Sequence, residues 1–288
     1  MLRSILRQGV APWLGCGLAL QLCSCIRFAS ELDTLDSERN GLDPASGQDW
    51  TCTLGARAPA PSSSGSEPAA EASAPEPRAA RLHVDLSVVD FVTAAPAQGL
   101  RVRACFRADV DCASPVSDEL PGSDGRVQVS ADPGFNGYLE IEALGMLPTL
   151  LFFAAPWSSQ VLARLEQAPV RLLPVPSLQA LADTAHLQLD PAGGVVGVSA
   201  YDCAGAVASG VQLQLDPSAV PYAFVDELPV VNQDVTSEQG LAGFVNVPPG
   251  VVVVRSFAEG QTEAVSVKSL LVRSGWLSSV SLLPGTSR

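Results

Sequence analysis

The sequence predicts an all-β fold, in which two tandem antiparallel β-sandwiches follow a signal peptide and a disordered tether. The first observation is an internal repeat: Asp90, Gly99 and the segment 170–174 recur as Asp202, Gly210 and the segment 280–284, at separations of 112, 111 and 110 residues. The second is a set of runs in which apolar and polar residues alternate between turn signals. The third is that neither repeat contains a helical pattern long enough for a parallel crossover.

Length and composition agree with this architecture. A chain of 288 residues holds two domains of about 100 residues each and further segments. Hydrophobic residues make up 47 % of the chain but aromatic residues only 6 %, which favours many short strands over a large aromatic pocket. The formal net charge of −13, without a basic run after the first residues, excludes nucleic acid as a partner.

The first segment, 1–24, is typical of a signal peptide. Arg3 and Arg7 precede a short apolar run at 10–20, which Pro12 and several glycines interrupt. About 20 uninterrupted apolar residues are needed to span a bilayer, so this run does not predict a permanent membrane helix.

The end of the leader, Leu22-Cys23-Ser24-Cys25, resembles the bacterial lipobox. The resemblance implies cleavage before Cys25 and acylation of its thiol, although Cys23 stands where the motif more often has Ala, Ser, Thr or Val. We therefore expect an exported lipoprotein that a lipid anchors to the membrane, at the outer membrane or the cell surface. The alternative is an ordinary cleaved signal, with Cys25 left as a thiol or a disulfide partner.

The segment 25–80 reads as the acylated Cys and a flexible tether rich in Pro, Ala and Ser. It has too few bulky apolar residues to offset the entropy of ordering, and as a coil it would hold the repeats about 40 Å from the lipid. The exception is 49–52, where Trp50 precedes Cys52. A Trp beside a Cys in a polar segment indicates a docking point on one of the repeats, and the alternative is that this part of the tether is flexible like the rest.

The first repeat, 81–176, has half-buried strand patterns at 100–104, 126–129 and 139–142. The apolar run 149–157 indicates a buried strand with Trp157 at its end, and the alternative is that an exposed part of it forms a partner-binding patch. Patterns of the same kind recur in the second repeat, 194–288, at 211–215 and 251–254. Short helices are expected at 159–167 and, with Ser177 as N-cap, at 178–185 within a connector that spans 177–193.

The order of landmarks in each repeat resembles the carboxypeptidase regulatory-like domain. In the first repeat these landmarks are Asp90, Gly99 before a strand, the turn Asp124-Gly125, and Gly137-Tyr138. The second repeat departs from the pattern, with Gln239-Gly240 at the turn and Val251 for the aromatic residue. The resemblance covers 81–174 and 194–284 and implies small Ig-like or transthyretin-like β-sandwiches.

The resemblance does not imply peptidase activity. Zinc carboxypeptidases use a His-x-x-Glu ligand pair, whereas neither His83 nor His186 is followed three residues later by Glu. A related cell-wall sandwich family forms a Lys to Asn isopeptide bond from its first strand. The only lysine of this chain, Lys268, lies late in the second repeat, which excludes that cross-link.

The cysteines predict two disulfides. Cys16 and Cys23 leave with the leader, and Cys25 is the expected acylation site, so four cysteines remain in an exported protein. Cys105 and Cys112 lie at the two ends of a hairpin-like segment and are expected to pair. By elimination Cys52 pairs with Cys203. Zinc binding by these four is disfavoured, because no Cys-x-x-Cys pair is present, and we expect no metal or other cofactor.

A cluster of acidic residues leaves calcium open as an alternative. Its members are Asp109, Asp111, Asp118 and Asp124. The spacing lacks the Gly and the closing Glu of a calcium loop, which favours solvated turns instead.

No nucleophile and base are arranged in a catalytic pattern, so we expect a protein without enzymatic activity. The predicted function is a cell-envelope lipoprotein that displays two β-sandwiches for binding or scaffolding, with the membrane and an unknown protein or glycan as partners. The alternative is a carbohydrate-binding module or an accessory subunit of a surface enzyme. This alternative requires exposed aromatic residues, for which the candidates are Trp157, Trp276, Tyr201 and Tyr222.

Overall fold

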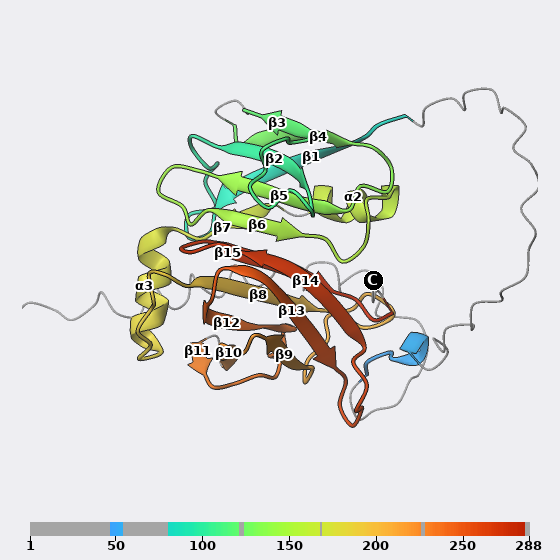
Figure 1. Ribbon diagram of the computed structural model, residues 1–288, viewed down its shortest axis with the longest axis vertical. Coiled ribbons are helices and arrows are strands. Elements are labelled where there is room, and N and C mark those ends of the chain that lie inside the picture. The colour runs from blue at the N-terminus through green and yellow to red at the C-terminus, as the bar shows by residue number, and fades with distance from the viewer. Residues whose placement is uncertain (1–46, 54–79, 121–123, 168, 226–227, 286–288) are drawn as a thin grey trace, which may run out of the picture.

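The computed structural model describes residues 47–53, 80–120, 124–167, 169–225 and 228–285 (Figure 1). The predicted signal peptide, Cys25 and most of the predicted tether lie outside these ranges. None of the helices in the described ranges has the length and apolar character needed to cross a membrane.

The described residues of the first repeat form seven strands and one helix. They are β1 (Leu82–Asp90), β2 (Arg101–Phe106), β3 (Ser117–Glu119), β4 (Arg126–Ala131), β5 (Gly137–Glu142), β6 (Thr149–Phe152), α2 (Ser159–Gln167) and β7 (Val170–Leu172). The strands carry the alternation that the sequence predicts. In β4, for example, Val127, Val129 and Ala131 are buried, whereas the side chains between them are exposed or half-buried.

The second repeat follows after α3 (Val175–Thr184), and its described residues form eight strands. They are β8 (Gly194–Ala200), β9 (Gln212–Asp216), β10 (Val220–Val225), β11 (Leu228–Val231), β12 (Leu241–Val247), β13 (Gly250–Phe257), β14 (Ser266–Val272) and β15 (Leu277–Leu282). The all-β fold class is therefore confirmed.

One nine-stranded sheet runs through both repeats, in the order β11-β10-β12-β8-β15-β6-β5-β2-β3 (Figure 1). The repeats join where β15 pairs in parallel with β6, from Leu277 opposite Thr149 to Val280 opposite Phe152. Two three-stranded sheets, β4-β1-β7 and β14-β13-β9, complete the two sandwiches. The repeats thus share a continuous backbone hydrogen-bond ladder.

The two small sheets cover opposite faces of the long sheet, as the alternation in β5 shows. Leu139 and Ile141 belong to a first core with residues of β1 and β4. Tyr138, two strands away from the second repeat, belongs to a second core with residues of β13 and β14. The second core therefore includes one face of the first repeat.

The expectation of purely antiparallel sandwiches is wrong in three places. Strand β1 pairs in parallel with β7, β8 pairs in parallel with β15, and β15 pairs in parallel with β6. Parallel strands need a crossover of a dozen or more residues, usually a helix. For β1 with β7 and for β8 with β15, the other strands of the same repeat form that connection. For β6 with β15, most of the second repeat forms it. The absence of a long helix therefore did not exclude parallel pairing.

Helix α2 has the expected bounds, but α3 begins earlier than expected. It starts at Val175, with Pro174 at the N-cap position and Pro176 in its first turn, so Ser177 is not the N-cap. A proline fits the first turn because its missing N–H would have no partner inside the helix. The predicted limits of the repeats and of the connector remain predictions.

Candidate functional site: a docked segment and a charge network between the repeats

The segment 47–53 docks on the second repeat through backbone and side-chain hydrogen bonds. The Asp49 N–H donates to Asp202 Oδ2 (3.0 Å), and the Cys203 N–H donates to the Asp49 carbonyl (2.7 Å). The Gln48 amide donates to the carbonyl and the hydroxyl of Ser209 (2.9 and 3.0 Å). These contacts hold the segment as an ordered part of the second repeat.

A disulfide between Cys52 and Cys203, with Cα atoms 5.8 Å apart, closes the same contact. Trp50 is half-buried and packs against the second core, and Thr51–Thr53 form a short 3-10 turn, blue in Figure 1. The docking point that Trp50 and Cys52 indicated is therefore present, with the expected cysteine partner.

The repeat position occupied by Asp90 and Asp202 has two different roles. In the first repeat, the bonds that Asp90 Oδ1 accepts from described residues come from its own turn, from the N–H groups of Val92 (2.6 Å) and Thr93 (2.9 Å). In the second repeat, Asp202 is 2 % exposed and accepts both from its own turn, at the Ala206 N–H, and from the docked segment. The second copy of this turn is adapted to hold the segment.

A buried charge network lies between the repeats. The Glu140 side chain on β5 is fully buried, and each of its carboxylate oxygens accepts from a different arginine. Arg103 on β2 binds Oε1, and Arg273, between β14 and β15, binds Oε2 at 2.5 Å. Arg273 belongs to the second repeat, whereas Glu140 and Arg103 belong to the first, so the network links the two.

Arg273 makes further contacts with the first repeat. It donates to the Val110 carbonyl (2.8 Å) and to the Tyr138 hydroxyl (3.4 Å), and its guanidinium lies 4.8 Å from the ring centroid of Trp276. Tyr138 in turn donates to the Asp109 carbonyl (2.6 Å), and burial raises the pKa of its hydroxyl. Among the described residues, no buried side-chain nitrogen or oxygen of Glu140, Arg103, Arg273 or Tyr138 lacks a hydrogen-bond partner, which a buried charge requires.

The second expected disulfide, Cys105–Cys112, lies beside Glu140, with Cα atoms 5.3 Å apart. The two sulfurs and the Glu140 carboxylate have potential metal-ligand atoms within 4.8 Å of one another. They do not fit a metal, because the sulfurs are bonded to each other and the carboxylate is held by two arginines. The three residues therefore stabilise the fold and do not offer free metal ligands.

The four candidate aromatic residues do not form one platform. Trp157 lies beyond β6, which ends at Phe152, and its side chain is 2 % exposed and packs edge-on against Phe135 and Phe153. Its use as an exposed binding residue is therefore wrong. The run 149–157 turns inward after β6, where Trp157 fills the first core.

The other three candidates are half-buried and lie apart. Trp276 packs under Arg273 against the second core, and Tyr201 lies just beyond β8. Tyr222 on β10 lies on the outer face, edge-on to Phe224, and burial raises the pKa of its hydroxyl to about 12.

The Tyr222 ring lies against Gly243 of the neighbouring strand. Tyr222 pairs with Gly243 of β12, which pairs with Gly197 of β8. A Cβ atom at Gly243 would overlap the Val196 carbonyl and lie 2.7 Å from the Tyr222 hydroxyl. At Gly197 the nearest neighbour of a Cβ would be Leu277 Cδ1 at 3.5 Å, an ordinary contact. Gly243 is therefore the position that the ring requires.

Two of the four acidic residues considered for calcium, Asp109 and Asp118, hold other partners. Asp109 accepts from the N–H groups of Ser114 (2.8 Å) and Ala113 (2.9 Å), which lower its pKa. Asp118 accepts two bonds from Arg101, which lowers the pKa of its carboxyl. These contacts favour the interpretation as capped turns.

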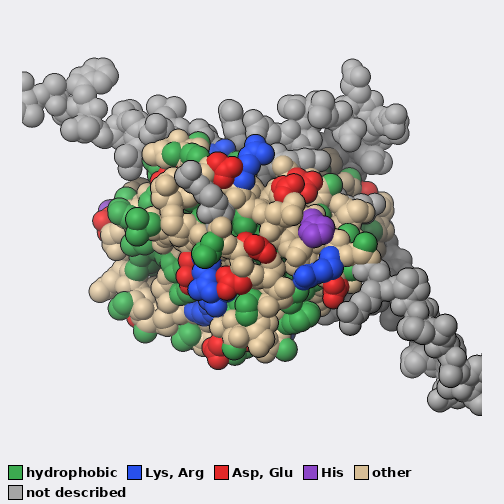
Figure 2. Space-filling model, turned by 90° about the horizontal axis from the view of Figure 1, so that it is seen from above, with side chains coloured by type: hydrophobic (Ala, Val, Ile, Leu, Met, Phe, Trp, Pro, Cys, Tyr) green, Lys and Arg blue, Asp and Glu red, His purple; other side chains and the backbone are tan. Residues whose placement is uncertain are grey.

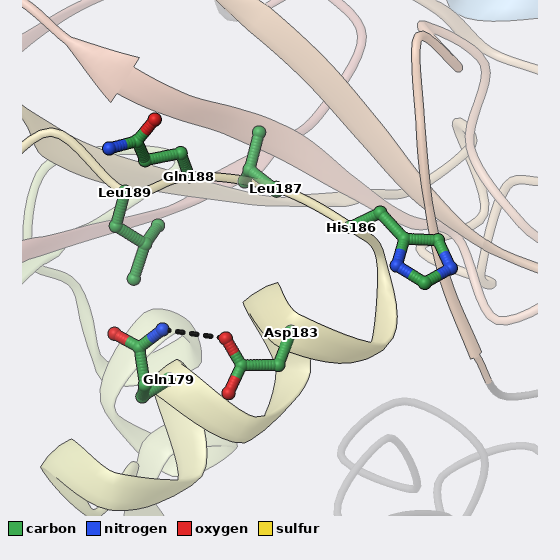
Figure 3. Close-up of a pocket in the computed structure, with 6 residues that line it drawn as sticks. All are labelled: Gln179, Asp183, His186, Leu187, Gln188 and Leu189. Atoms are coloured by element: carbon green, nitrogen blue, oxygen red, sulfur yellow. Dashed lines mark hydrogen bonds between the residues drawn. The ribbon is translucent and has the colours of Figure 1, made fainter.

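A shallow polar pocket lies beside the C-terminal end of α3 (Figure 3). In it Gln179 donates to Asp183 (2.8 Å), and His186 points away from this pair. The hydrogen bond that the structure shows among its lining residues joins an amide to a carboxylate, which is not a nucleophile–base pair. On the face shown in Figure 2, acidic and basic side chains are interspersed, without the broad basic patch that a nucleic-acid site needs.

Sequence reasoning missed the charge network. Glu140 stands between Leu139 and Ile141, a pattern that predicts a solvent-facing carboxylate, and its partner Arg273 is 133 residues away. The burial of Lys268 was missed for the same reason, because its sequence neighbours give no sign of what covers the strand.

No protein-family model matches this chain, and no curated protein matches it. Among solved structures it is similar to the Bacillus anthracis TIE protein, at 13 % identity and a TM-score of 0.23, over 70 % of this chain and 33 % of that one. It is also similar to the Streptococcal ancillary pilin, at 12 % identity and a TM-score of 0.22, over 71 % of this chain and 69 % of that one. A third similar structure is the shaft pilin spaA from Lactobacillus rhamnosus GG, at 10 % identity and a TM-score of 0.23, over 72 % of this chain and 98 % of that one. The chain thus spans about a third of the TIE protein. At these TM-scores the similarities carry no argument about function.

Proposed function

We propose that this chain is a non-enzymatic cell-envelope lipoprotein that displays its two repeats as one rigid binding or scaffolding module. The observation that carries the proposal is the docked segment. The chain that follows the predicted acylation site, Cys25, is fastened to the second repeat by the Cys52–Cys203 disulfide and by the hydrogen bonds of Gln48 and Asp49. A lipid anchor at Cys25 would therefore be linked covalently to the second repeat, through the chain that leads to Cys52 and through its disulfide with Cys203.

The continuous sheet supports a rigid module. Strand β15 pairs with β6 of the first repeat and with β8 of the second, and the Arg273–Glu140 pair links the repeats beside this seam. A shared ladder with a desolvated ion pair resists hinge motion more than the polar interfaces usual between domains. Two surfaces of the module would therefore keep a fixed relative orientation.

The polar side chains in the described ranges support a role without catalysis. Glu140, Asp202 and Asp109 each accept hydrogen bonds that stabilise a turn or the seam. The proposal includes the assignment of each repeat to the carboxypeptidase regulatory-like type, with limits 81–176 and 194–288.

The anchor is tested in a bacterium that acylates lipoproteins, fed with an alkyne-tagged fatty acid. The wild-type chain should carry the label and sediment with membranes, whereas Cys25→Ser should lose the label and stay unprocessed or be released. The double variant Cys52→Ala/Cys203→Ala is the control and should keep the label. If the Cys25→Ser variant is retained at the membrane as well as the wild type, Cys25 does not carry a lipid anchor.

The carbohydrate-binding alternative is tested on a glycan array with the oxidised mature protein. The four candidate aromatic residues do not form a platform in the described part of the chain, so we expect no reproducible glycan binding. Binding that Trp276→Ala abolishes would overturn our preference for a protein partner.

A further inference from the structure

The two disulfides in the described part of the chain differ in exposure. Cys105 and Cys112 are 0 % and 1 % exposed and belong to the second core. Cys52 is exposed and Cys203 is half-buried, so their bond lies at the surface of the second repeat. Thiol–disulfide exchange requires that a thiolate reaches one of the two sulfurs, so access decides which bond reacts. A dissolved dithiol therefore reaches the Cys52–Cys203 bond first.

The two sulfurs of the exposed bond are not equivalent. Cys52 is the more exposed residue of the pair, so its Sγ is the one that an attacking thiolate meets. The Cys52 N–H donates to Cys203 Sγ (3.1 Å). A hydrogen bond to the charged form of a group favours that form, so this N–H stabilises the negative charge that Cys203 takes when it leaves. The geometry favours attack at Cys52, with Cys203 as the leaving thiolate.

The same bond fastens the docked segment 47–53. The other contacts of this segment are the hydrogen bonds of Gln48 and Asp49 and the packing of Trp50 against the second core, and these are only partly buried. Water competes for such hydrogen bonds, so each gives a small net gain, while ordering the segment costs conformational entropy. Without the disulfide, the segment therefore docks and undocks.

We propose that Cys52–Cys203 is a redox-sensitive cross-link, which a dithiol oxidoreductase of the Cys-x-x-Cys class opens at Cys52. The first thiolate of the reductant attacks Cys52 Sγ, the Cys52–Cys203 bond breaks, and Cys203 leaves as a thiolate. The second thiolate of the reductant then attacks its own sulfur in the mixed disulfide, and Cys52 leaves. The reductant loses two electrons and becomes a disulfide, and its two protons end on Cys52 and Cys203.

Opening the cross-link frees the docked segment and removes the bond from the Asp49 N–H to Asp202. The exchange takes place in the folded part of the chain and does not depend on the lipid anchor. One consequence rests on the proposed anchor: in the reduced chain Cys25 is linked covalently to the second repeat only through the first repeat. Reduction would therefore change how the module is held at the membrane.

The test uses the oxidised mature protein with Cys25→Ser, in which the four disulfide cysteines are the only cysteines, so its result is independent of acylation. Limiting dithiothreitol is added, new thiols are alkylated at intervals, and the alkylated peptides are identified by mass spectrometry. Cys52 and Cys203 should be alkylated at least about tenfold faster than Cys105 and Cys112. Equal rates for all four, or faster alkylation of Cys105 and Cys112, would overturn the assignment.

The direction of attack is tested with thioredoxin whose second active-site cysteine is replaced by serine, so that the mixed disulfide is not resolved. After alkylation of the remaining thiols, peptide mapping should find the thioredoxin adduct on Cys52. An adduct on Cys203 would contradict the proposed direction.

Release of the segment is measured by amide hydrogen exchange in the peptide that contains residues 47–53. Reduction should speed this exchange at least about tenfold, while peptides of β13 and β14 stay protected. Gln48→Ala is the matched control, because it removes the bonds to Ser209 and leaves the disulfide intact. In its oxidised form, exchange should stay within about twofold of the oxidised parent protein. Equal protection of the segment before and after reduction would show that the disulfide does not control docking.

Discussion

Replacing Arg273 by Met tests whether the buried network holds the repeats together. The Glu140 side chain is fully buried, and the side chains of Arg103 and Arg273 are 19 % and 21 % exposed. Breaking a buried ion pair by removing one partner costs about 3 to 5 kcal/mol. Arg103 remains as a partner of Glu140, and Arg273 is partly solvated, so we expect a loss of about 2 to 3 kcal/mol. For a protein of this size that lowers Tm by about 4 to 12 °C.

The assay is urea unfolding of the oxidised mature protein at pH 7, followed by tryptophan fluorescence and far-UV circular dichroism. The triple variant Arg103→Met/Glu140→Leu/Arg273→Met removes all the charges and should return to within about 1 kcal/mol of the wild type. Arg101→Met is the control, since its pair with Asp118 is exposed (42 % and 35 %) and should contribute at most about 1 kcal/mol. If Arg273→Met costs no more than this control, the network does not stabilise the seam.

Three further changes are testable by the same unfolding measurement. Gly243→Ala should cost about 1 to 3 kcal/mol through overlap with its neighbours, whereas Gly197→Ala should change stability by less than about 1 kcal/mol; equal effects would contradict the packing argument. The double variant Cys52→Ala/Cys203→Ala opens a loop with a sequence separation of 151 and should lose at most about 5 kcal/mol, with faster proteolysis of the docked segment; unchanged proteolysis would show that the hydrogen bonds suffice. Hydrogen bonds from backbone N–H groups lower the pKa of Asp109 below 3.8 in the folded state, so its stabilisation is complete above the unfolded pKa and is lost as pH falls through the folded pKa. Asp109→Asn should therefore flatten the loss of stability below about pH 4, and an unchanged acid profile would count against this assignment.

The sequence predicted the strands because alternation is a local property of the backbone. Successive side chains of a strand point to opposite faces, so the alternation at 126–129 and 211–215 identified β4 and β9 without any knowledge of the fold. The disulfide between Cys105 and Cys112 was predictable for the same reason, since their separation of 7 residues keeps them close in a hairpin. The Cys52–Cys203 pairing followed from the even number of remaining cysteines.

The same alternation misled where the second repeat covers the first. In Leu139-Glu140-Ile141 it separated the two faces of β5 correctly, but it placed Glu140 in water. Its face is instead part of the second core, where Arg273 meets it. The burial of Trp157 depended on Phe135, which is distant in the sequence. The start of α3 was missed because Pro174, and not Ser177, occupies its N-cap position.

By itself, the sequence determined the internal repeat, the all-β class and the two disulfide partners, because these depend on local periodicity and on cysteine parity. Only the tertiary structure decided that β15 pairs with β6, that the two sandwiches share one sheet, and that Glu140 is buried where Arg273 of the other repeat binds it. The alternation along a strand shows to which side of the sheet a side chain points, but not whether another part of the chain buries that side. Which residues lose their water therefore depends on pairing across more than a hundred residues, to which no local pattern is sensitive.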